Sequence, residues 1–156
     1  MQRVEAPPAI LTSLPPAERY RLIGEIVTLM TQSPVHKVYR VEDLPLTILI
    51  PIELNQFRIY RNAKGEPMAL VTWGMFSIET EAAFLRQAAL LTKEDWCSGD
   101  IVYFTDFIAP HGHVKQVVKD LRERFRGKTT YSIHYDAPNQ RRPRIRQFTG
   151  YKDKGI

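Results

Sequence analysis

The spacing of apolar residues along the chain predicts a mixture of helices and strands. From about Pro15 to Thr31, apolar side chains recur at helical spacing, and we expect Ser13 to be the N-cap of this helix and Pro34 to end it. The apolar run at residues 46–50 predicts a short buried strand. The first part of the chain is therefore expected to hold one helix and one strand.

A β-hairpin and a second helix are expected next. Residues 56–62 and 68–73 predict two strands joined by a turn, and Gly74 is expected to mark a bulge or the end of the second strand. Ser77 is a suitable N-cap for a helix that we expect to end near Lys93.

The second half of the chain predicts three more strands and one more helix. A strand at 101–108 is followed by a helix that begins near Val114, and further strands are expected at 130–135 and 144–151. This order of elements predicts a single α/β or α+β domain with a mixed sheet.

Length and composition agree with one domain. The chain has 156 residues, of which 44% are hydrophobic and 25% are charged, as in a globular domain with a buried core. We assign residues 13–156 to this domain and residues 1–12, which include two prolines, to a flexible N-terminal arm.

The net charge and the number of cysteines limit the kinds of partner and compartment that we expect. The net charge of +5 favours an acidic partner, such as nucleic acid, an anionic membrane surface or an acidic protein. The single cysteine, Cys97, excludes an internal disulfide and fits a reducing compartment. We find neither the unbroken apolar region of a signal peptide nor an apolar run long enough for a bilayer. We therefore expect a cytoplasmic protein with no integral membrane segment.

An aspartate interrupts the apolar strand predicted at 101–108. Strict alternation would place Asp106 on one face with Val102, Phe104 and Ile108. A buried carboxylate is costly unless it is paired or hydrogen-bonded. Two interpretations stay open: a structural aspartate bonded to backbone amides or an arginine, or a carboxylate that orients a catalytic histidine.

The histidines and the cysteine offer few other signals. His36 lies in a loop after the first predicted helix, where a lone histidine is usually a surface residue. His111 and His113 form an H-x-H pair, but no cysteine or carboxylate stands at ligand spacing, so we expect no metal site. Cys97 fits a small, semi-buried thiol better than a nucleophile.

The run 94-EDWCSGDIVYFTDFIAPHG-112 resembles the signature of the RTX toxin-activating lysine acyltransferases, the hemolysin-activating family. That signature contains an acid-Asp-Trp, a Ser-Gly-Asp, an aromatic residue, an Asp two residues before Ile-Ala-Pro, and a Gly. The resemblance covers roughly residues 20–150, and 37–52 follows the family only loosely. Four further matches occur upstream in the family's order: 33-SPVH-36, 55-NQF-57, 72-TWG-74 and 77-SIETE-81.

The resemblance implies a fold and a reaction. The fold would be similar to that of the GNAT N-acyltransferases, a mixed, mostly antiparallel sheet flanked by helices. The reaction would move a fatty acyl group from the phosphopantetheine thioester of acyl carrier protein to the ε-amine of internal lysines of an RTX protoxin. No cofactor would be bound permanently. Acyl carrier protein and the protoxin would be partners, and a homodimer is left open.

The resemblance also implies site residues. The family's catalytic histidine falls on His36 and its catalytic aspartate on Asp106. Ser33 would hold the loop or contact the acyl donor, and Gly112 lies at the strand-to-helix junction where GNAT-like folds meet the donor. Thr47 stands where a polar residue, often Asn, is expected, in a region that would help shape the acyl pocket.

The implied residues suit the chemistry. A lysine amine has a reference pKa of about 10.4 and must lose a proton before it attacks a thioester. A histidine is a suitable base, and a carboxylate bonded to its other ring nitrogen fixes the tautomer and stabilises the imidazolium. Direct attack by the amine and a covalent acyl-histidine step both remain open.

The basic residues suggest where an acidic partner binds, and they leave alternatives. A docked acyl carrier protein and a solvated basic face are both compatible with them. Two other functions remain open: a GNAT-type enzyme that uses acyl-coenzyme A on another amine, and a non-catalytic basic binding module. The chain has no recognised nucleic-acid motif, and its basic cluster has no interleaved aromatic residues beyond Phe148 and Tyr151, so we expect no nucleic-acid partner. The basic positions are Lys115, Lys119, Arg122, Arg124, Arg141, Arg142, Arg144, Arg146, Lys152 and Lys154.

Overall fold

A five-stranded sheet forms the centre of the molecule, which we describe from a computed structural model at residues 11, 13–86, 91–134 and 144–152. The strands lie side by side in chain order, and every neighbouring pair is antiparallel except β3 and β4. The strands are β1 (Phe57–Arg61), β2 (Pro67–Phe76), β3 (Ile101–Ile108), β4 (Thr129–His134) and β5 (Arg144–Thr149).

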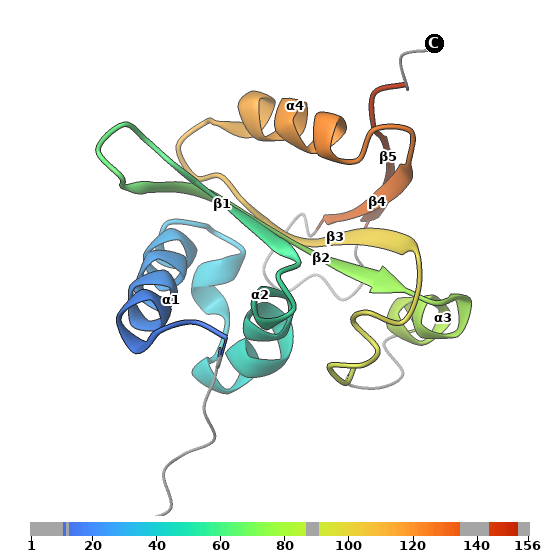
Figure 1. Cartoon of the computed structure of the whole chain (residues 1–156), viewed down its shortest axis with the longest axis horizontal. Coiled ribbons are helices and arrows are strands. Elements are labelled where there is room, and N and C mark those ends of the chain that lie inside the picture. The colour runs from blue at the N-terminus through green and yellow to red at the C-terminus, as the bar shows by residue number, and fades with distance from the viewer. Residues whose placement is uncertain (1–10, 12, 87–90, 135–143, 153–156) are drawn as a thin grey trace, which may run out of the picture.

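Helices cover both faces of this sheet (Figure 1). Helix α4 lies on one face, while α1, α2 and α3 lie on the other. The mixed, mostly antiparallel sheet flanked by helices confirms the predicted fold class. The helices are α1 (Pro16–Thr31), α2 (Ile50–Glu53), α3 (Ile78–Leu85) and α4 (Val114–Arg124).

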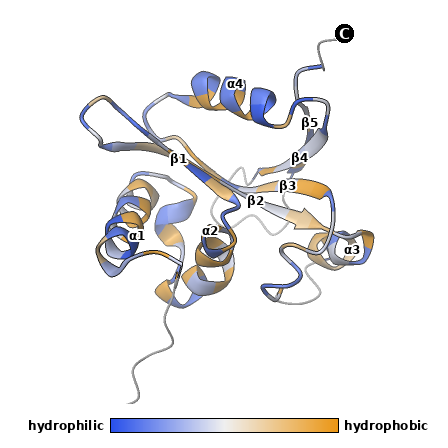
Figure 2. Cartoon of the chain, in the orientation of Figure 1, coloured by the Kyte–Doolittle hydropathy of each residue, from blue (hydrophilic) through white to orange (hydrophobic). Residues whose placement is uncertain are grey.

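Each face of the sheet has its own apolar core. Leu70 and Ile108 pack against α1 on one side, and Trp73 and Phe104 pack against α4 on the other. Apolar residues follow much of β3, whereas α4 mixes polar and apolar positions, as expected for a helix with one buried face (Figure 2). The centre of the sheet is therefore buried on both faces.

Helix α1 matches its prediction except at the cap. Pro15, not Ser13, occupies the N-cap position, and no side chain caps the helix. Pro16 follows at the first helical position, where proline is favoured because its backbone angle suits a helix start. The helix buries an apolar stripe against the sheet. Leu11, inside the predicted arm, is also fully buried in this core, while the rest of that arm lies outside the described residues.

The strand predicted at 46–50 is wrong, because this segment is helical. A π-helix at Pro45–Leu49 continues into α2. A short apolar run cannot be assigned to strand or helix by periodicity alone, and its buried residues, Ile48, Leu49 and Ile52, follow helical spacing. The chain therefore has five strands and no strand before β1 within the described residues.

Helix α3 begins where Ser77 predicted, with the Ser77 hydroxyl accepting from the Thr80 amide at 3.1 Å. It ends at Leu85, earlier than the predicted end near Lys93; residues 87–90 lie outside the described part. Beyond them the chain forms a turn at residues 93–96, in which Thr92 and Asp95 bond each other's backbone amides. Such local bonds compete with helix formation.

Cys97, which follows this turn, is exposed rather than semi-buried. Its backbone forms an isolated parallel bridge with Met75. The thiol donates weak hydrogen bonds to two nearby backbone carbonyls, those of Lys93 and Glu94. The position of Cys97 is therefore set by the preceding turn and by its backbone bridge, and its side chain is not part of a core.

A bulge in β3 changes which residues share a face. Thr72 of β2 pairs with Asp106, and the next residue, Trp73, pairs with Phe104, so Thr105 has no partner across this ladder. Because of the bulge, Asp106 lies on the face of the sheet that packs on α1, whereas Phe104 lies on the face that packs on α4. The predicted common face of Asp106, Ile108, Val102 and Phe104 is therefore wrong. Gly74 marks neither the bulge nor a strand end, since β2 continues to Phe76.

The parallel pairing of β3 and β4 is short. The two strands are joined through α4 and pair only at Val102, Tyr103 and Phe104 of β3. β3 continues to Ile108 and β4 to His134 without further pairing between them. The sheet therefore opens between these strands at the level of Asp106.

Two glycines predict opposite effects of a methyl group on stability. An ideal Cβ at Gly99 would lie 2.5 Å from the Phe76 carbonyl oxygen, so Gly99→Ala should lower the free energy of unfolding by about 1–3 kcal/mol. A Cβ at Gly24, inside α1, meets nothing within 4 Å, and Gly24→Ala should raise that free energy by roughly 1 kcal/mol. Urea denaturation of both variants measures this, and the same sign for both would contradict it.

An ion pair ties α1 to the sheet. Arg61 of β1 donates to both carboxylate oxygens of Glu25, at 2.6 and 3.1 Å, and Arg21 adds a bond of 3.1 Å. Glu25 is 9% exposed. The hydrogen bonds from Arg61 hold the pKa of Glu25 below its ordinary value, although burial acts in the opposite direction.

This pairing predicts a pH-dependent loss in Arg61→Met. A carboxyl whose pKa is lowered on folding stabilises the protein above its unfolded pKa, and this contribution disappears as pH falls through the folded pKa. The unfolding free energy of Arg61→Met should therefore be lower than that of the wild type at pH 7, with the difference shrinking below about pH 4. Arg40→Met is the control, because its partners are exposed. A difference independent of pH would exclude the proposed cause.

Candidate active site

His36 is brought to the sheet by the segment that follows α1. The helix ends at Thr31, and the Ser33 carbonyl accepts from the Lys37 amide at 2.9 Å, which closes a turn. A 3₁₀ helix, His36–Val38, follows directly. His36 is only 7% exposed, so the loop histidine is buried.

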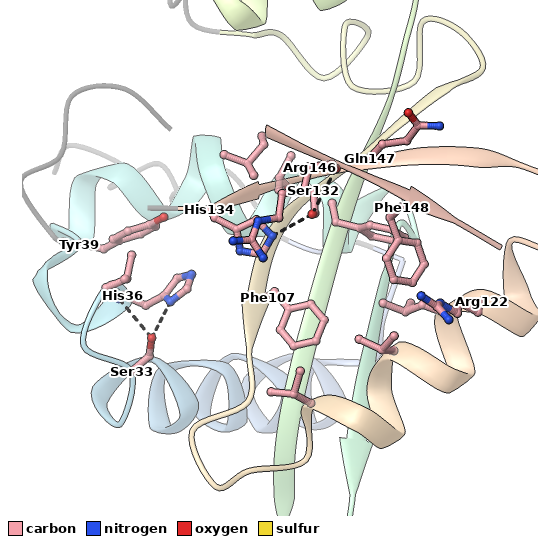
Figure 3. A pocket seen from close by; sticks show the side chains of 17 residues that line it. Ser33, His36, Tyr39, Phe107, Arg122, Ser132, His134, Arg146, Gln147 and Phe148 are labelled. Carbon is pink, nitrogen blue, oxygen red and sulfur yellow. Dashed lines mark hydrogen bonds between the residues drawn. The ribbon is translucent and has the colours of Figure 1, made fainter. Parts of the chain in front are cut away.

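Both ring nitrogens of His36 have hydrogen-bond partners. Nε2 lies 3.2 Å from Oδ1 of Asp106, and Nδ1 lies 2.7 Å from the hydroxyl of Ser33 (Figure 3). An ionised carboxylate only accepts hydrogen bonds, so beside it Nε2 carries the proton and Nδ1 is the acceptor for the Ser33 hydroxyl. The structure thus brings three predicted site residues into one chain of hydrogen bonds.

Asp106 receives two further hydrogen bonds that the sequence did not reveal. The Tyr39 hydroxyl donates to Oδ1 at 3.2 Å, and the Thr72 hydroxyl donates to Oδ2 at 3.1 Å. Thr72 is fully buried and also contacts the hydroxyl of Thr105, the bulged residue, at 2.9 Å. Thr72 belongs to the quoted TWG match, but nothing in the sequence indicated that its hydroxyl faces the carboxylate.

A cavity of about 540 Å³ adjoins this group. Its lining combines Ser33, His36 and Tyr39 from the α1 side of the sheet with α4 residues from the other side. The cavity therefore crosses the sheet at the opening between β3 and β4. Much of its wall is apolar, including Val35, Phe107, Val114, Val118, Leu121 and Phe148.

The far wall of the cavity comes from β4 and β5. Ser132 and His134 line it, with the Ser132 hydroxyl 2.9 Å from Nε2 of His134. Arg146, which pairs with Ser132 in the sheet, lies beside them in Figure 3. Sequence reasoning placed Arg146 in a basic cluster but missed Ser132 and His134, because they carry no motif.

The other two predicted site residues lie elsewhere. Gly112 has a φ of +87° at the turn before α4, and Thr47 donates to the Asp43 carbonyl at 2.8 Å. Neither residue lines the cavity described here. Their assignment to substrate binding stays a prediction.

The histidines of the H-x-H pair point to different surroundings. His111 contacts the side chain of Gln32 at 2.6 Å. Nδ1 of His113 is buried and has no hydrogen-bond partner in the part of the chain that the structure describes. Among the residues that the structure describes, no three His, Cys, Asp or Glu side chains are grouped so that they could hold a metal. Within the same residues, every helix is too short or too polar to cross a bilayer.

The hydrogen bond from Thr72 to Asp106 predicts that its removal lowers the stability of the fold. Thr72→Val keeps the shape but removes a buried donor to the carboxylate, so the unfolding free energy should fall by about 1–3 kcal/mol. Thr105→Val is the matched control, because its hydroxyl bonds Thr72 and not Asp106, and its effect should be smaller. Chemical denaturation measures both, and equal losses would argue against a specific role for the Thr72 bond.

Comparison with known proteins identifies the family. The RTX toxin acyltransferase family matches residues 16–149. The chain is 32% identical over 133 residues to the RTX-I toxin-activating lysine-acyltransferase ApxIC of Actinobacillus pleuropneumoniae, covering 85% of this chain and 76% of that protein.

Two further relatives agree. Identity is 36% over 108 residues with the lysine-acyltransferase RtxC of Vibrio cholerae, covering 69% of this chain and 71% of the relative. A third relative is a protein-lysine myristoyltransferase, HlyC, of Escherichia coli. Its identity to this chain is 30% over 131 residues, which cover 84% of this chain and 76% of the relative. The family match over residues 16–149 and the identities of 30–36% to these relatives lead to one conclusion. The chain belongs to the RTX toxin acyltransferase family and is an acyltransferase.

Proposed function

We propose that this protein transfers a fatty acyl group from acyl carrier protein to the ε-amine of internal lysines of an RTX protoxin. One relative is named as a toxin-activating lysine-acyltransferase and another as a protein-lysine myristoyltransferase, which supports a lysine acceptor. The observation that carries the proposal is His36, held between Ser33 and Asp106 at the wall of a largely apolar cavity.

His36 serves as the general base. The lysine nitrogen attacks the thioester carbonyl, a C–N bond forms, the C–S bond breaks, and the amine proton passes through His36 to the leaving thiolate. Nδ1 is the ring nitrogen that can accept the proton, and it is already hydrogen-bonded to the Ser33 hydroxyl. Ser33 therefore either relays the proton or moves aside for the amine, while Asp106 stabilises the imidazolium.

The hydrogen bonds of the ring favour direct transfer over an acyl-histidine. Nε2 faces Asp106, and a buried carboxylate beside it leaves no approach for a thioester carbon. Nδ1 would have to lose the Ser33 hydroxyl before it could act as a nucleophile. A base needs only to receive a proton, which the existing hydrogen bond to Ser33 already allows.

The opening in the sheet suits a donor with a long arm. The unpaired edges of β3 and β4 and the apolar lining would accept an extended amide chain and its acyl group. The basic residues on α4 and β5 would favour an acidic carrier protein; Arg141, Arg142 and Lys154 of this set lie outside the described residues.

The proposal predicts which substitutions abolish transfer. With fatty-acyl carrier protein and an RTX protoxin, His36→Ala and Asp106→Asn should each reduce the rate of lysine acylation by about 10²–10⁴-fold, because general base catalysis is lost. Mass spectrometry of the protoxin locates and counts the acylated lysines. His111→Ala is the matched control, because this exposed histidine does not line the cavity, and its rate should equal that of the wild type.

The same assay separates the alternatives. Full activity of the His36 and Asp106 variants would contradict the base assignment, and absence of acylation by the wild type with intact, folded substrates would contradict the enzyme proposal. Replacing the carrier protein by fatty acyl-coenzyme A tests the rival donor. Faster transfer from acyl-coenzyme A to a small amine would favour a GNAT-type enzyme of another specificity.

A further inference from the structure

Two arginines give the cavity beside His36 a positive charge. They are Arg122 of α4 and Arg146 of β5, and both line the cavity. Among the described residues that line it there is no aspartate or glutamate; Asp106 lies behind His36 and is itself buried. A cavity with this lining attracts an anion.

The two arginines in the cavity differ from several others in the described part of the chain, which are paired with carboxylates. Arg61 and Arg58 are each paired with a carboxylate, those of Glu25 and Asp120. Within the described chain, Arg122 and Arg146 make no ion pair. Their side chains are exposed, so binding an anion there would not require breaking an existing ion pair.

The position of Arg122 is supported by an aromatic contact. Its guanidinium carbon lies 5.5 Å from the centre of the Phe148 ring, within cation–π range. This contact restricts the side chain to the cavity wall. A guanidinium is the side chain best suited to phosphate, since its planar donors bind two oxygens at once.

Arg122 lies away from the proposed base, whereas Arg146 lies nearer to it, beside His134. Figure 3 shows His36 at one end of the cavity and Arg122 at the other, with Phe107 between them and Arg146 next to Ser132 and His134. A ligand that extends from His36 to Arg122 would therefore place its reacting carbon near His36 and its anionic end toward Arg122, and it would pass Arg146. An acyl chain alone would gain nothing from guanidinium groups, so the charged end fits the arm that carries the thioester.

We propose that Arg122 and Arg146 bind the phosphate group at the far end of the donor's thioester arm. This inference rests on the proposed function, in which the donor is a phosphopantetheine thioester. The two arginines are then binding residues that recognise the arm itself, whichever fatty acid it carries. They select a phosphorylated thioester over an otherwise identical one without phosphate.

Two synthetic donors test this selection. Acyl-phosphopantetheine and acyl-pantetheine share the thioester and differ only in the phosphate. For the wild type, kcat/KM for acylation of the protoxin should be about tenfold higher or more with the phosphorylated donor, as expected for charge-assisted hydrogen bonds. In Arg122→Gln/Arg146→Gln this ratio should approach one.

Arg124→Gln is the matched control. It removes the same charge from the same helix, but Arg124 lies over Trp73 and outside the cavity lining, so the ratio should be unchanged. A thioether analogue of each donor, titrated by calorimetry, measures binding without transfer. A phosphate preference in binding that the double variant loses supports the arginine site even if no transfer occurs.

Two results would overturn the inference. A wild-type ratio near one, with transfer detected, would show that the phosphate is not recognised although the proposed function holds. A preference that persists in the folded double variant would show that other residues bind the phosphate. Transfer from neither donor nor from the carrier protein, by contrast, would contradict the proposed function itself.

Discussion

One hydrogen bond, between Nε2 of His36 and Oδ1 of Asp106, joins two segments that lie far apart in the sequence. It requires α1 to be packed on the sheet, because the segment that carries His36 follows that helix. It also requires Asp106 to face α1, which the bulge at Thr105 provides. The ion pair of Glu25 with Arg61 and the apolar core around Ile108 therefore support the site although they do not touch it.

The carboxylate of Asp106 is buried, and both of its oxygens accept hydrogen bonds. Asp106 accepts from His36 and Tyr39 on one oxygen and from Thr72 on the other. A buried carboxylate with this many donors is held in one orientation, and it holds the imidazole in turn. The same strand positions the cavity, because β3 separates from β4 just beyond Phe104 and leaves the opening that the lining residues surround. The hydrogen-bonded group and the cavity thus have a common structural origin.

Much of the fold could be predicted from the sequence, because alternation and caps are local signals. Strand β3, the hairpin of β1 and β2 and the Ser77 cap were all predicted. The segment at 46–50 could not be assigned in this way, since a short apolar run fits a buried helix as well as a strand. The bulge at Thr105 was also invisible, because it depends on the register of β2 against β3 rather than on the residues of β3 alone.

For the site, the sequence predicted the residues of the hydrogen-bonded group through their resemblance to a family, and the structure brings Ser33, His36 and Asp106 together. It could not predict Tyr39 and Thr72, whose roles arise from packing across 67 and 34 residues of chain. It also could not predict the cavity wall at Ser132 and His134, because these residues reach the site only through the crossover from β3 to β4.

The most direct test of the central bond is nitrogen-15 NMR of the protein labelled at histidine. At a pH where the ring is neutral, we expect the His36 signal of the Nε2–H tautomer, with Nδ1 unprotonated, because Asp106 accepts from Nε2. In Asp106→Ala this preference should weaken. An Nδ1–H tautomer in the wild type, or the same tautomer balance in both proteins, would contradict the view that Asp106 orients the imidazole for catalysis.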